Sequence, residues 1–431
     1  MKEFLFVAQN FPPANVSGTV RPFYFAKYLA ENGWKPHVLA CRPNKNLPAD
    51  HTLLKELEGT CEIHYLSQFD DHRFTVGLRK LHERLRSKNT AVHRGAAFVV
   101  RGISRIWKNI THYLTVAHFT LKARQIARHH KIKLVWATGD PWTSFEIGRH
   151  IKCFLSIPFV MDQRDPWTYG AMWAPTSELS ANRERKKERR ALQAADAVVY
   201  TSPLTCGIMK SRNPADIAAK MTVICNGYEP DPNEIPPAAD ESQKQQLTLR
   251  YIGSLKGHRT PFPPLQALKS LVESGRVGND IHLEFVGNSQ DWETLTEEYT
   301  QKGLATFIGP VPYAESLGMM RTANCLVLLQ TLEEGRDVIS GKAYEYVASK
   351  RPILAVVPED GGDAWLLREC GAGIIADFRD ETAIENAIEE IYKLWQHDRL
   401  TTMSLQRLPV QFERRQLTKQ LAHLLDDTTR R

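Results

Sequence analysis

Short runs of apolar residues recur along the whole chain, separated by stretches in which apolar residues return every three or four positions. The short runs predict buried strands, and the longer spacing predicts helices that cover them. Six runs lie in the first half, at 4–8, 37–41, 134–137, 158–162, 197–201 and 222–225, and six in the second, at 248–252, 282–286, 306–308, 325–329, 353–357 and 373–376. This alternation is typical of parallel sheets, and it predicts an α/β fold with two doubly wound, Rossmann-like domains.

A polar segment that contains three prolines separates the two sets of predicted strands. Proline interrupts the hydrogen bonding of helices and sheets, so this segment is expected to be a linker. We expect an N-terminal domain over 1–230, the linker over 231–246, a C-terminal domain over 247–405, and a C-terminal helix within 406–431 that packs back on the N-terminal domain. Domains of this kind that face each other enclose a cleft at the carboxyl ends of their strands, where ligands bind.

Charge is distributed unevenly along the chain. Residues 73–133 contain fifteen Lys or Arg and one acid, a net +14, whereas the whole chain carries +7, so the remainder carries −7. Within this segment, apolar residues at 78, 81 and 85 and at 99, 103, 106 and 110 recur at helical spacing. The pattern predicts basic amphipathic helices, which either bind an anionic membrane surface or form a solvated face packed on a core.

The seven cysteines are scattered and never spaced C-x-x-C, which suggests neither a disulfide framework nor a zinc knuckle and favours a reducing, cytoplasmic location. No window approaches the roughly 18 apolar residues of a spanning helix, so membrane contact is expected to be peripheral, on the inner face of the cell membrane. The chain has fifteen histidines but no H-E-x-x-H motif, so a metal site is not predicted. Basic residues are not interleaved with aromatic ones, and no nucleic-acid partner is expected.

Polar and glycine residues follow two predicted strands of the first half. Gly18 lies in a small turn before a predicted helix, where unpaired amides suit an anion or a closely approaching sugar. Asp162, Arg164 and Asp165 end another apolar strand. This charged cluster is either catalytic or a structural ion pair, with Arg164 and Asp165 fixing the loop.

In the second half, Gly253, Lys256 and Arg259 follow a strand and precede a helix. Glycine permits close backbone approach, and the two cations can meet phosphate charge, so the loop is either a diphosphate cradle or an ordinary polar connection.

The stretch D-V-I-S-G-K-A-Y-E at 337–345 carries the most information. Ser340 and Gly341 can open a helix whose amides point at phosphates, and Lys342 adds a full positive charge. One turn further on, the carboxylate of Glu345 can accept hydrogen bonds from the vicinal hydroxyls of a ribose, while Asp337 can reach another hydroxylated ring. The alternative is that Glu345 only offsets Lys342 on a solvated face.

With these residues in view, nearly all of the chain resembles the retaining family-4 glycosyltransferases of the GT-B fold. The pattern F-P-P at 11–13 followed by S-G-x-x-R at 17–21 resembles their first acceptor-side loop and helix. The stretch D-Q-R-D-P-W at 162–167 resembles a branch that builds bacterial surface polysaccharides. The most specific match is G-K-x-x-E-Y-x-A-x-x-R-P-I-L-A at 341–355, which resembles the donor-site helix of that branch.

The resemblance implies roles for particular residues. The paired acids of the family match Asp337, near the donor sugar, and Glu345, on the ribose; Asp337 is shorter than the glutamate usual there. Arg164 stands where many relatives carry a histidine. The residues that match the basic contacts to the diphosphate are Arg259 and Lys342, with Lys256 as a further candidate, and the backbone from Ile308 to Tyr313 matches the nucleobase site.

The implied reaction moves a hexosyl or related group from a nucleotide diphosphate donor to a glycan or lipid-linked acceptor, with retention of configuration and without a metal or other cofactor. Two other hypotheses stay open. One is a nucleotide-sugar epimerase or hydrolase of the same architecture. The other is a noncatalytic binding protein on this fold.

Overall fold

The computed structural model describes residues 1–14, 16–43, 49–67, 72–87, 91–170, 173–230, 245–255, 259–289, 292, 294–331 and 335–430. The predicted linker, 231–246, lies outside these ranges except for its last two residues, and Lys256 lies outside them as well.

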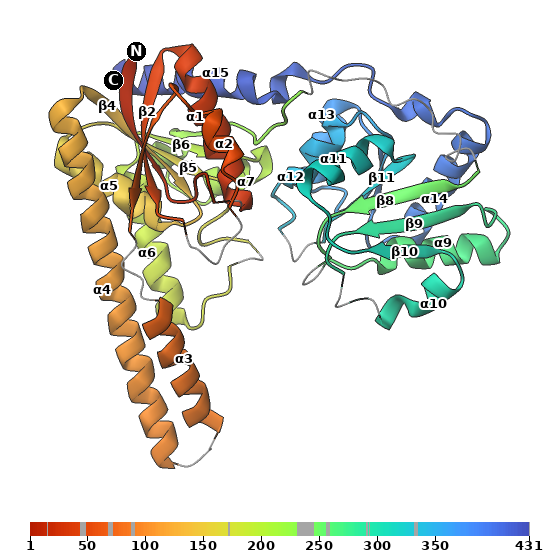
Figure 1. Cartoon of the computed structure of the whole chain (residues 1–431), viewed down its shortest axis with the longest axis horizontal. Helices are drawn as coiled ribbons and strands as arrows, with labels where there is room; N and C mark the ends of the chain where they lie inside the picture. Colours follow the sequence, from red (N-terminus) through yellow and green to blue (C-terminus); the bar gives the residue numbers. More distant parts are fainter. Residues whose placement is uncertain are drawn as a thin grey trace.

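The first half of the chain forms a seven-stranded parallel sheet with the order β3-β2-β1-β4-β5-β6-β7 (Figure 1). Its strands are β1 (Lys2–Ala8), β2 (Trp34–Cys41), β3 (Glu62–Leu66), β4 (Ile132–Gly139), β5 (Phe159–Gln163), β6 (Ala197–Tyr200) and β7 (Met221–Val223). Its helices are α1 (Val20–Leu29), α2 (Thr52–Lys55), α3 (His72–Ser87), α4 (Ala91–His129), α5 (Thr143–Leu155), α6 (Glu178–Ala194), α7 (Pro203–Ser211) and α8 (Ala215–Ala218). Beyond their first two residues, strands β1 and β4 are buried, and both lie near the middle of the sheet, so they read as continuous apolar runs.

The second half forms a six-stranded parallel sheet with the order β10-β9-β8-β11-β12-β13. Its strands are β8 (Leu247–Ile252), β9 (Ile281–Val286), β10 (Ala305–Ile308), β11 (Cys325–Leu329), β12 (Ile353–Val357) and β13 (Ile374–Asp377). Its helices are α9 (Phe262–Glu273), α10 (Glu297–Gln301), α11 (Tyr313–Thr322), α12 (Gly341–Ala348), α13 (Gly362–Cys370) and α14 (Glu381–Gln396). The prediction of two doubly wound α/β domains is therefore confirmed.

The apolar pattern does not predict β3, which pairs with β2 at the edge of the first sheet. Its sequence mixes polar Glu62 and His64 with apolar residues, and only Leu66 is buried. An edge strand that is half covered lacks the continuous apolar run of a central strand, which explains why this strand was missed.

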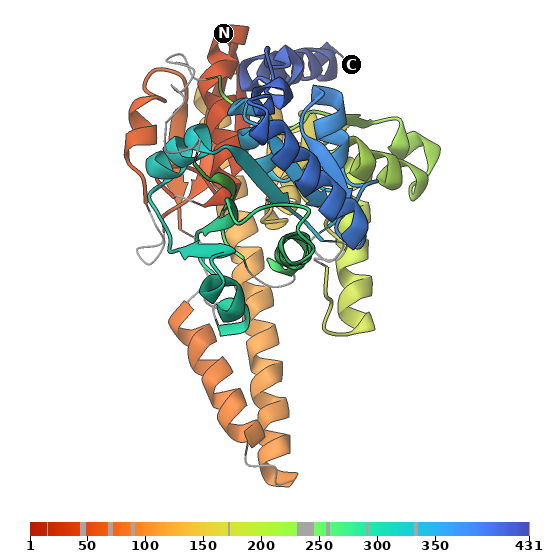
Figure 2. The ribbon, with the colours of Figure 1, turned by 90° about the vertical axis from the view of Figure 1, so that its right-hand side faces the viewer.

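Helices α3 and α4 form a long hairpin that projects from the N-terminal domain (Figures 1 and 2). Helix α4 has 39 residues, a length of roughly 58 Å at 1.5 Å per residue. Its carboxyl half packs on the sheet through Val116, Phe119, Ala123 and Ile126, whereas its amino half packs on α3. Among the described helices, none combines the length and the apolar character needed to cross a bilayer.

The last helix, α15 (Arg414–Arg430), lies on the N-terminal domain, against α1 (Figure 1). Asp426 accepts hydrogen bonds from Lys2 at 2.6 Å and from the Trp34 indole at 3.0 Å, so both ends of the chain meet there. Leu417, Leu421 and Leu425 of α15 are buried in an apolar cluster that contains residues of both domains. This helix therefore joins the two domains a second time.

Candidate active site

The carboxyl ends of the two sheets enclose a cleft of about 730 Å³. Predicted site residues that line this cleft are Gly18, Arg164, Asp165, Arg259, Ser340, Gly341, Lys342 and Glu345. These residues come from both domains. The first and the last of them, Gly18 and Glu345, are more than 300 positions apart in the sequence. The structure thus brings most of the predicted site together between the domains.

The amino end of α12 opens onto the cleft. Ser340 is its N-cap, and the Ser340 hydroxyl accepts a hydrogen bond from the amide of Ala343 at 3.2 Å. Gly341 is exposed and lines the cleft. Because the first amides of a helix have no partner within it and carry partial positive charge, this end of α12 suits an anion.

Asp363 holds this end of α12 from the protein interior. Its carboxylate is fully buried and accepts a hydrogen bond from the amide of Ser340 at 2.7 Å. Burial raises the pKa of Asp363 to about 6, although the amide of Ser340 and the nearby charges of Arg259 and Lys342 act in the opposite direction. No local motif predicts this role, because Asp363 lies 23 residues beyond the N-cap, Ser340, to which it is bonded.

Lys342 is positioned by a tyrosine from the adjacent strand. Its ammonium donates a hydrogen bond to the Tyr251 hydroxyl at 2.7 Å and lies 4.5 Å from the centre of the Tyr251 ring. Gly253 has a φ of +143°, and a Cβ atom there would lie 1.9 Å from the Lys342 nitrogen. The glycine predicted to approach the donor therefore makes room for the lysine, and Gly253 itself does not line the cleft.

Arg259 and Glu345 complete the C-terminal wall. Both line the cleft and are partly exposed, and Glu345 lies one turn into α12, after Lys342. Ile308 ends β10, and Tyr313 begins α11; neither belongs to the lining of this cleft. The structure therefore does not place the expected nucleobase residues in the lining of this cleft.

On the opposite wall, Arg164 is held by backbone carbonyls. Its guanidinium donates hydrogen bonds to Gly139 O at 3.0 Å, to Gly18 O at 2.6 Å and to Asp140 O. A Cβ atom on Gly18 would lie 2.8 Å from the guanidinium, so a larger residue there would displace the Arg164 side chain. Arg164 thus connects three loops, while its neighbour Asp165 lines the cleft with a pKa that burial raises.

Asp162 lies beneath this wall rather than on it. The carboxylate is fully buried and forms an ion pair with Arg21 at 2.8 Å, and it also accepts a hydrogen bond from Thr138 at 2.7 Å. Arg21 in turn donates to the Cys225 carbonyl at 2.7 Å. Of the alternatives for the charged cluster, the structure contains an ion pair, but it joins Asp162 to Arg21 and not Arg164 to Asp165.

Asp337 lies at the contact between the domains and does not line the cleft. Its carboxylate accepts a hydrogen bond from the Tyr169 hydroxyl at 2.8 Å, and its carbonyl accepts bonds from Ser202 and from Thr205, the latter at 2.9 Å. In this arrangement the paired acids are separated: Glu345 faces the cleft, and Asp337 holds the N-terminal domain.

Other lining residues were not among the predicted site residues. These are Asn10, Val16, Val20, Arg21, Asp140, Asn226, Gly227, Gln330, Val338, Ile339 and Arg414. Arg414, the first residue of α15, lies with its guanidinium 4.0 Å from the centre of the Tyr24 ring. The lining includes five cationic side chains and three carboxylates, and this excess of positive charge suits an anionic ligand.

The fold and the cleft define the class of protein. Across 99% of this chain and 98% of the other, the structure is similar to a glycosyltransferase from Rickettsia africae, with a TM-score of 0.65 and 12% identity. A lipopolysaccharide outer core galactosyltransferase, WaaB, matches over 99% of both chains with a TM-score of 0.58 and 11% identity. A UDP-N-acetylglucosamine 2-epimerase matches over 100% and 98% with a TM-score of 0.51 and 12% identity. These likenesses show the GT-B fold.

The sequence adds the family. Residues 20–232 match the model of Glycosyltransferase Family 4. No curated protein sequence matches the chain. The family match in the N-terminal half and the GT-B fold of the whole chain confirm the resemblance of its motifs to the family-4 glycosyltransferases.

Proposed function

We propose that this glycosyltransferase moves a hexosyl or related group from a nucleotide diphosphate sugar to a glycan or lipid-linked acceptor in cell-surface polysaccharide biosynthesis, with retention of configuration. One observation carries the donor half of the proposal: the amino end of α12, the ammonium of Lys342 and the guanidinium of Arg259 meet at the same cleft. That combination of charge and amide dipoles is suited to a diphosphate.

In this proposal, the bond from the sugar C1 to the diphosphate oxygen breaks, and the acceptor oxygen bonds to C1 on the same face. Negative charge grows on the leaving diphosphate, which takes up the proton of the acceptor hydroxyl. Lys342, Arg259 and the first amides of α12 stabilise that charge, and removal of one such donor typically costs about 3 to 4 kcal/mol of the activation free energy. The groups are cationic or dipolar parts of the chain itself, so the proposal includes no metal or other cofactor. Glu345 binds the ribose hydroxyls of the donor.

The acceptor lies on the opposite wall. Arg164 fixes the Gly18 and Gly139 loops, and Asp165 presents a carboxyl group at the cleft. We propose that Asp165 forms a hydrogen bond with the acceptor hydroxyl. Asp162 acts indirectly, because its ion pair holds Arg21 in position.

Contact with an anionic membrane surface through residues 73–133 is a further part of the proposal. Apolar side chains of the hairpin are exposed, including Phe98 at 79%, Ile106 at 60% and Tyr113 at 65%. From 84 to 139 the sequence has no acid. A helix with an exposed apolar face and a cationic polar face binds at the interface of an anionic bilayer. This exposure supports membrane contact over the alternative of a solvated helix packed on a core, in which these apolar side chains would be buried.

A flotation assay tests the membrane part. Wild-type protein is expected to float with vesicles that contain anionic lipid and to remain in the bottom fraction when the vesicles are neutral. Replacement of Arg101, Arg105 and Lys108 by Gln is expected to weaken flotation, whereas the same change at Arg183, Lys186 and Arg190 of α6, all exposed, is the matched control. Equal flotation on neutral vesicles, or equal loss in the control, would contradict the membrane contact.

Product analysis tests the reaction. The protein is incubated with a panel of nucleotide sugars and with glycan and lipid-linked acceptors, and the released nucleotide is measured. A transferase releases nucleoside diphosphate together with a new glycoside, in equal amounts. An epimerase returns the nucleotide sugar with an altered sugar, a hydrolase releases free sugar, and a noncatalytic protein binds the donor without turnover; each of these outcomes would replace the proposal.

A further inference from the structure

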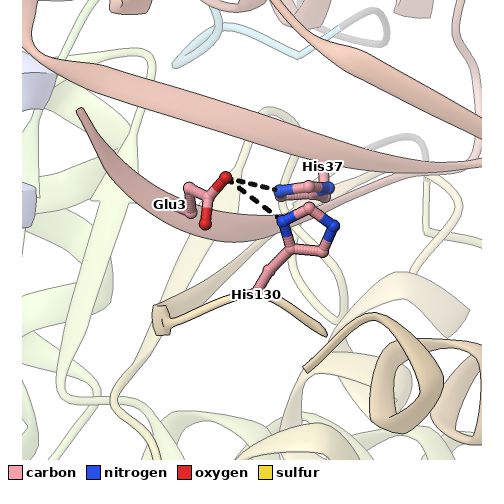
Figure 3. Close-up of side chains that lie close together, drawn as sticks. All are labelled: Glu3, His37 and His130. Atoms are coloured by element: carbon pink, nitrogen blue, oxygen red, sulfur yellow. Dashed lines mark hydrogen bonds and ion pairs between the residues drawn. The ribbon is translucent and has the colours of Figure 1, made fainter. Parts of the chain in front are cut away.

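A cluster of histidines and glutamates lies at the other end of the first sheet, away from the cleft. Glu3 is near the start of β1, His37 is in β2, and His130 lies between α4 and β4 (Figure 3). His37 pairs with Leu5 on one side and with Glu62 of β3 on the other. The cluster therefore joins two strands of the sheet to the end of the long helix α4.

The distances within this cluster match those between ligands of one metal ion. The Glu3 carboxylate lies 3.2 Å from His130 Nδ1 and 3.5 Å from His37 Nε2. All three ligand atoms lie within 4.8 Å of one another. Bonds of about 2.0 to 2.2 Å in a tetrahedral zinc site place neighbouring ligand atoms at about 3.3 to 3.5 Å. The three side chains thus need little movement to share an ion.

His37 provides an independent indication of a ligand. Its side chain is fully buried, yet neither ring nitrogen makes a hydrogen bond to any residue that the structure describes. The contacts of these nitrogens with Glu3 at 3.5 Å and Glu62 at 3.4 Å are longer than normal hydrogen bonds. Because a buried polar group whose contacts are this long is incompletely satisfied, a ligand between His37 and Glu3 would stabilise it.

We propose that Glu3, His37 and His130 bind one divalent transition-metal ion, with a water molecule as the fourth ligand. Two imidazoles and one carboxylate are the ligands that Zn²⁺ takes in such sites. Glu3 and His130 are partly exposed, which leaves a path by which the ion enters.

Glu62 has a supporting role in this site. A second triad, His37, Glu62 and His64, is also close enough to share an ion. However, Glu62 forms an ion pair with Lys35, and a neighbouring ammonium opposes a second cation there, whereas Glu3 has no lysine or arginine partner among the described ion pairs. Glu62 faces His37 Nδ1, so it can hold the ring while Nε2 binds the metal, which is the usual carboxylate–histidine–metal arrangement.

The ion would fix the base of the hairpin. His130 directly follows α4, and Glu3 and His37 belong to β1 and β2, so a shared metal ties the helix to the sheet. The sequence does not reveal the site, because its ligands lie at positions 3, 37 and 130 and form no spaced motif. The site is far from the donor-binding residues, and it does not depend on the proposed reaction.

Zinc titration of the full chain tests the proposal, with any affinity tag removed and with chelator-treated protein. Wild-type protein is expected to bind one equivalent of Zn²⁺ and to unfold at a higher temperature with Zn²⁺ than without it. His130→Asn and Glu3→Gln are expected to weaken binding by more than about tenfold, and Glu62→Gln by about ten- to a hundredfold. His129→Asn, which changes the adjacent exposed histidine, is the matched control and is expected to bind as the wild type does.

Co²⁺ provides a measurement on the wild-type protein, in case a variant fails to fold. Visible absorption typical of tetrahedral Co²⁺, displaced by Zn²⁺, is the expected result. Absence of stoichiometric binding in the wild type, or equal affinities for the folded His130→Asn and His129→Asn variants, would overturn the site. Neither measurement involves transferase activity, so its outcome is independent of the proposed function.

Discussion

The two walls of the cleft contain the same types of charged residue but use them differently. On the N-terminal wall, Arg21 is neutralised by buried Asp162, and Arg164 donates to three backbone carbonyls of two other loops. On the C-terminal wall, the ammonium of Lys342 is held by the neutral hydroxyl of Tyr251 beside the open end of α12. The comparison indicates that the first wall uses its arginines to fix shape, while the second presents positive charge to a ligand.

The largest expected effect comes from breaking the ion pair under the N-terminal wall. Asp162→Ala leaves the buried Arg21 guanidinium without its carboxylate, and removal of one partner of a buried pair costs about 3 to 5 kcal/mol. Urea unfolding of this variant should therefore show a free energy of unfolding lower by about that amount. Asp216→Ala, at an exposed position of α8, is the matched control and should change little. If Asp162→Ala has the same free energy of unfolding as the wild type, the ion pair with Arg21 does not stabilise the fold.

Lys342→Ala tests the other wall through activity rather than stability. Loss of a charge that acts on the leaving diphosphate should lower kcat about 100- to 1000-fold, whereas the unfolding transition should move little, because the ammonium lies at the cleft. Lys302→Ala, on an exposed surface of the same domain, serves as the control. Unchanged turnover in a folded Lys342→Ala variant would show that the wall does not hold the leaving group.

Asp363 predicts a pH dependence. Its pKa of about 6 in the folded protein is higher than the ordinary value of 3.8 because the carboxyl group is buried. Between these values the folded state binds the extra proton, so the free energy of unfolding should fall as the pH rises from about 4 to 6, by at most about 3 kcal/mol. Asp363→Asn should remove that part of the slope in unfolding measurements over this range. If the free energy of unfolding depends on pH equally in the variant and the wild type, that dependence comes from groups other than Asp363.

The smallest expected effect concerns the contact between the domains. Tyr169→Phe removes the hydrogen bond from the Tyr169 hydroxyl to the Asp337 carboxylate, and a bond of this kind contributes about 0.5 to 1.5 kcal/mol, more if the acceptor is charged. Thermal unfolding should therefore shift slightly downward. Tyr65→Phe is the comparison variant, because it also removes one tyrosine hydroxyl, which donates to the Pro12 carbonyl within the N-terminal domain and does not contact Asp337. No shift in Tyr169→Phe would mean that Asp337 does not depend on this contact.

Local patterns predicted the parts of the molecule that are encoded locally. The apolar runs gave the central strands, and the adjacent Ser340, Gly341 and Lys342 gave the helix end, because a strand and a helix N-terminus each depend on neighbouring residues. Pairs formed by the tertiary fold could not be predicted in the same way. Arg21 meets Asp162 across 141 positions, and Tyr251 meets Lys342 across 91. The same limit explains why the placement of Asp337 between the domains had no sequence signal.

The central claim is that a diphosphate binds between α12, Lys342 and Arg259. A crystal structure of the protein with a nucleoside diphosphate tests it most directly. The account predicts phosphate oxygens within hydrogen-bond distance of the amide of Gly341 and the ammonium of Lys342, with the ribose at Glu345. A nucleotide bound elsewhere, with this end of the cleft closed or vacant, would contradict it.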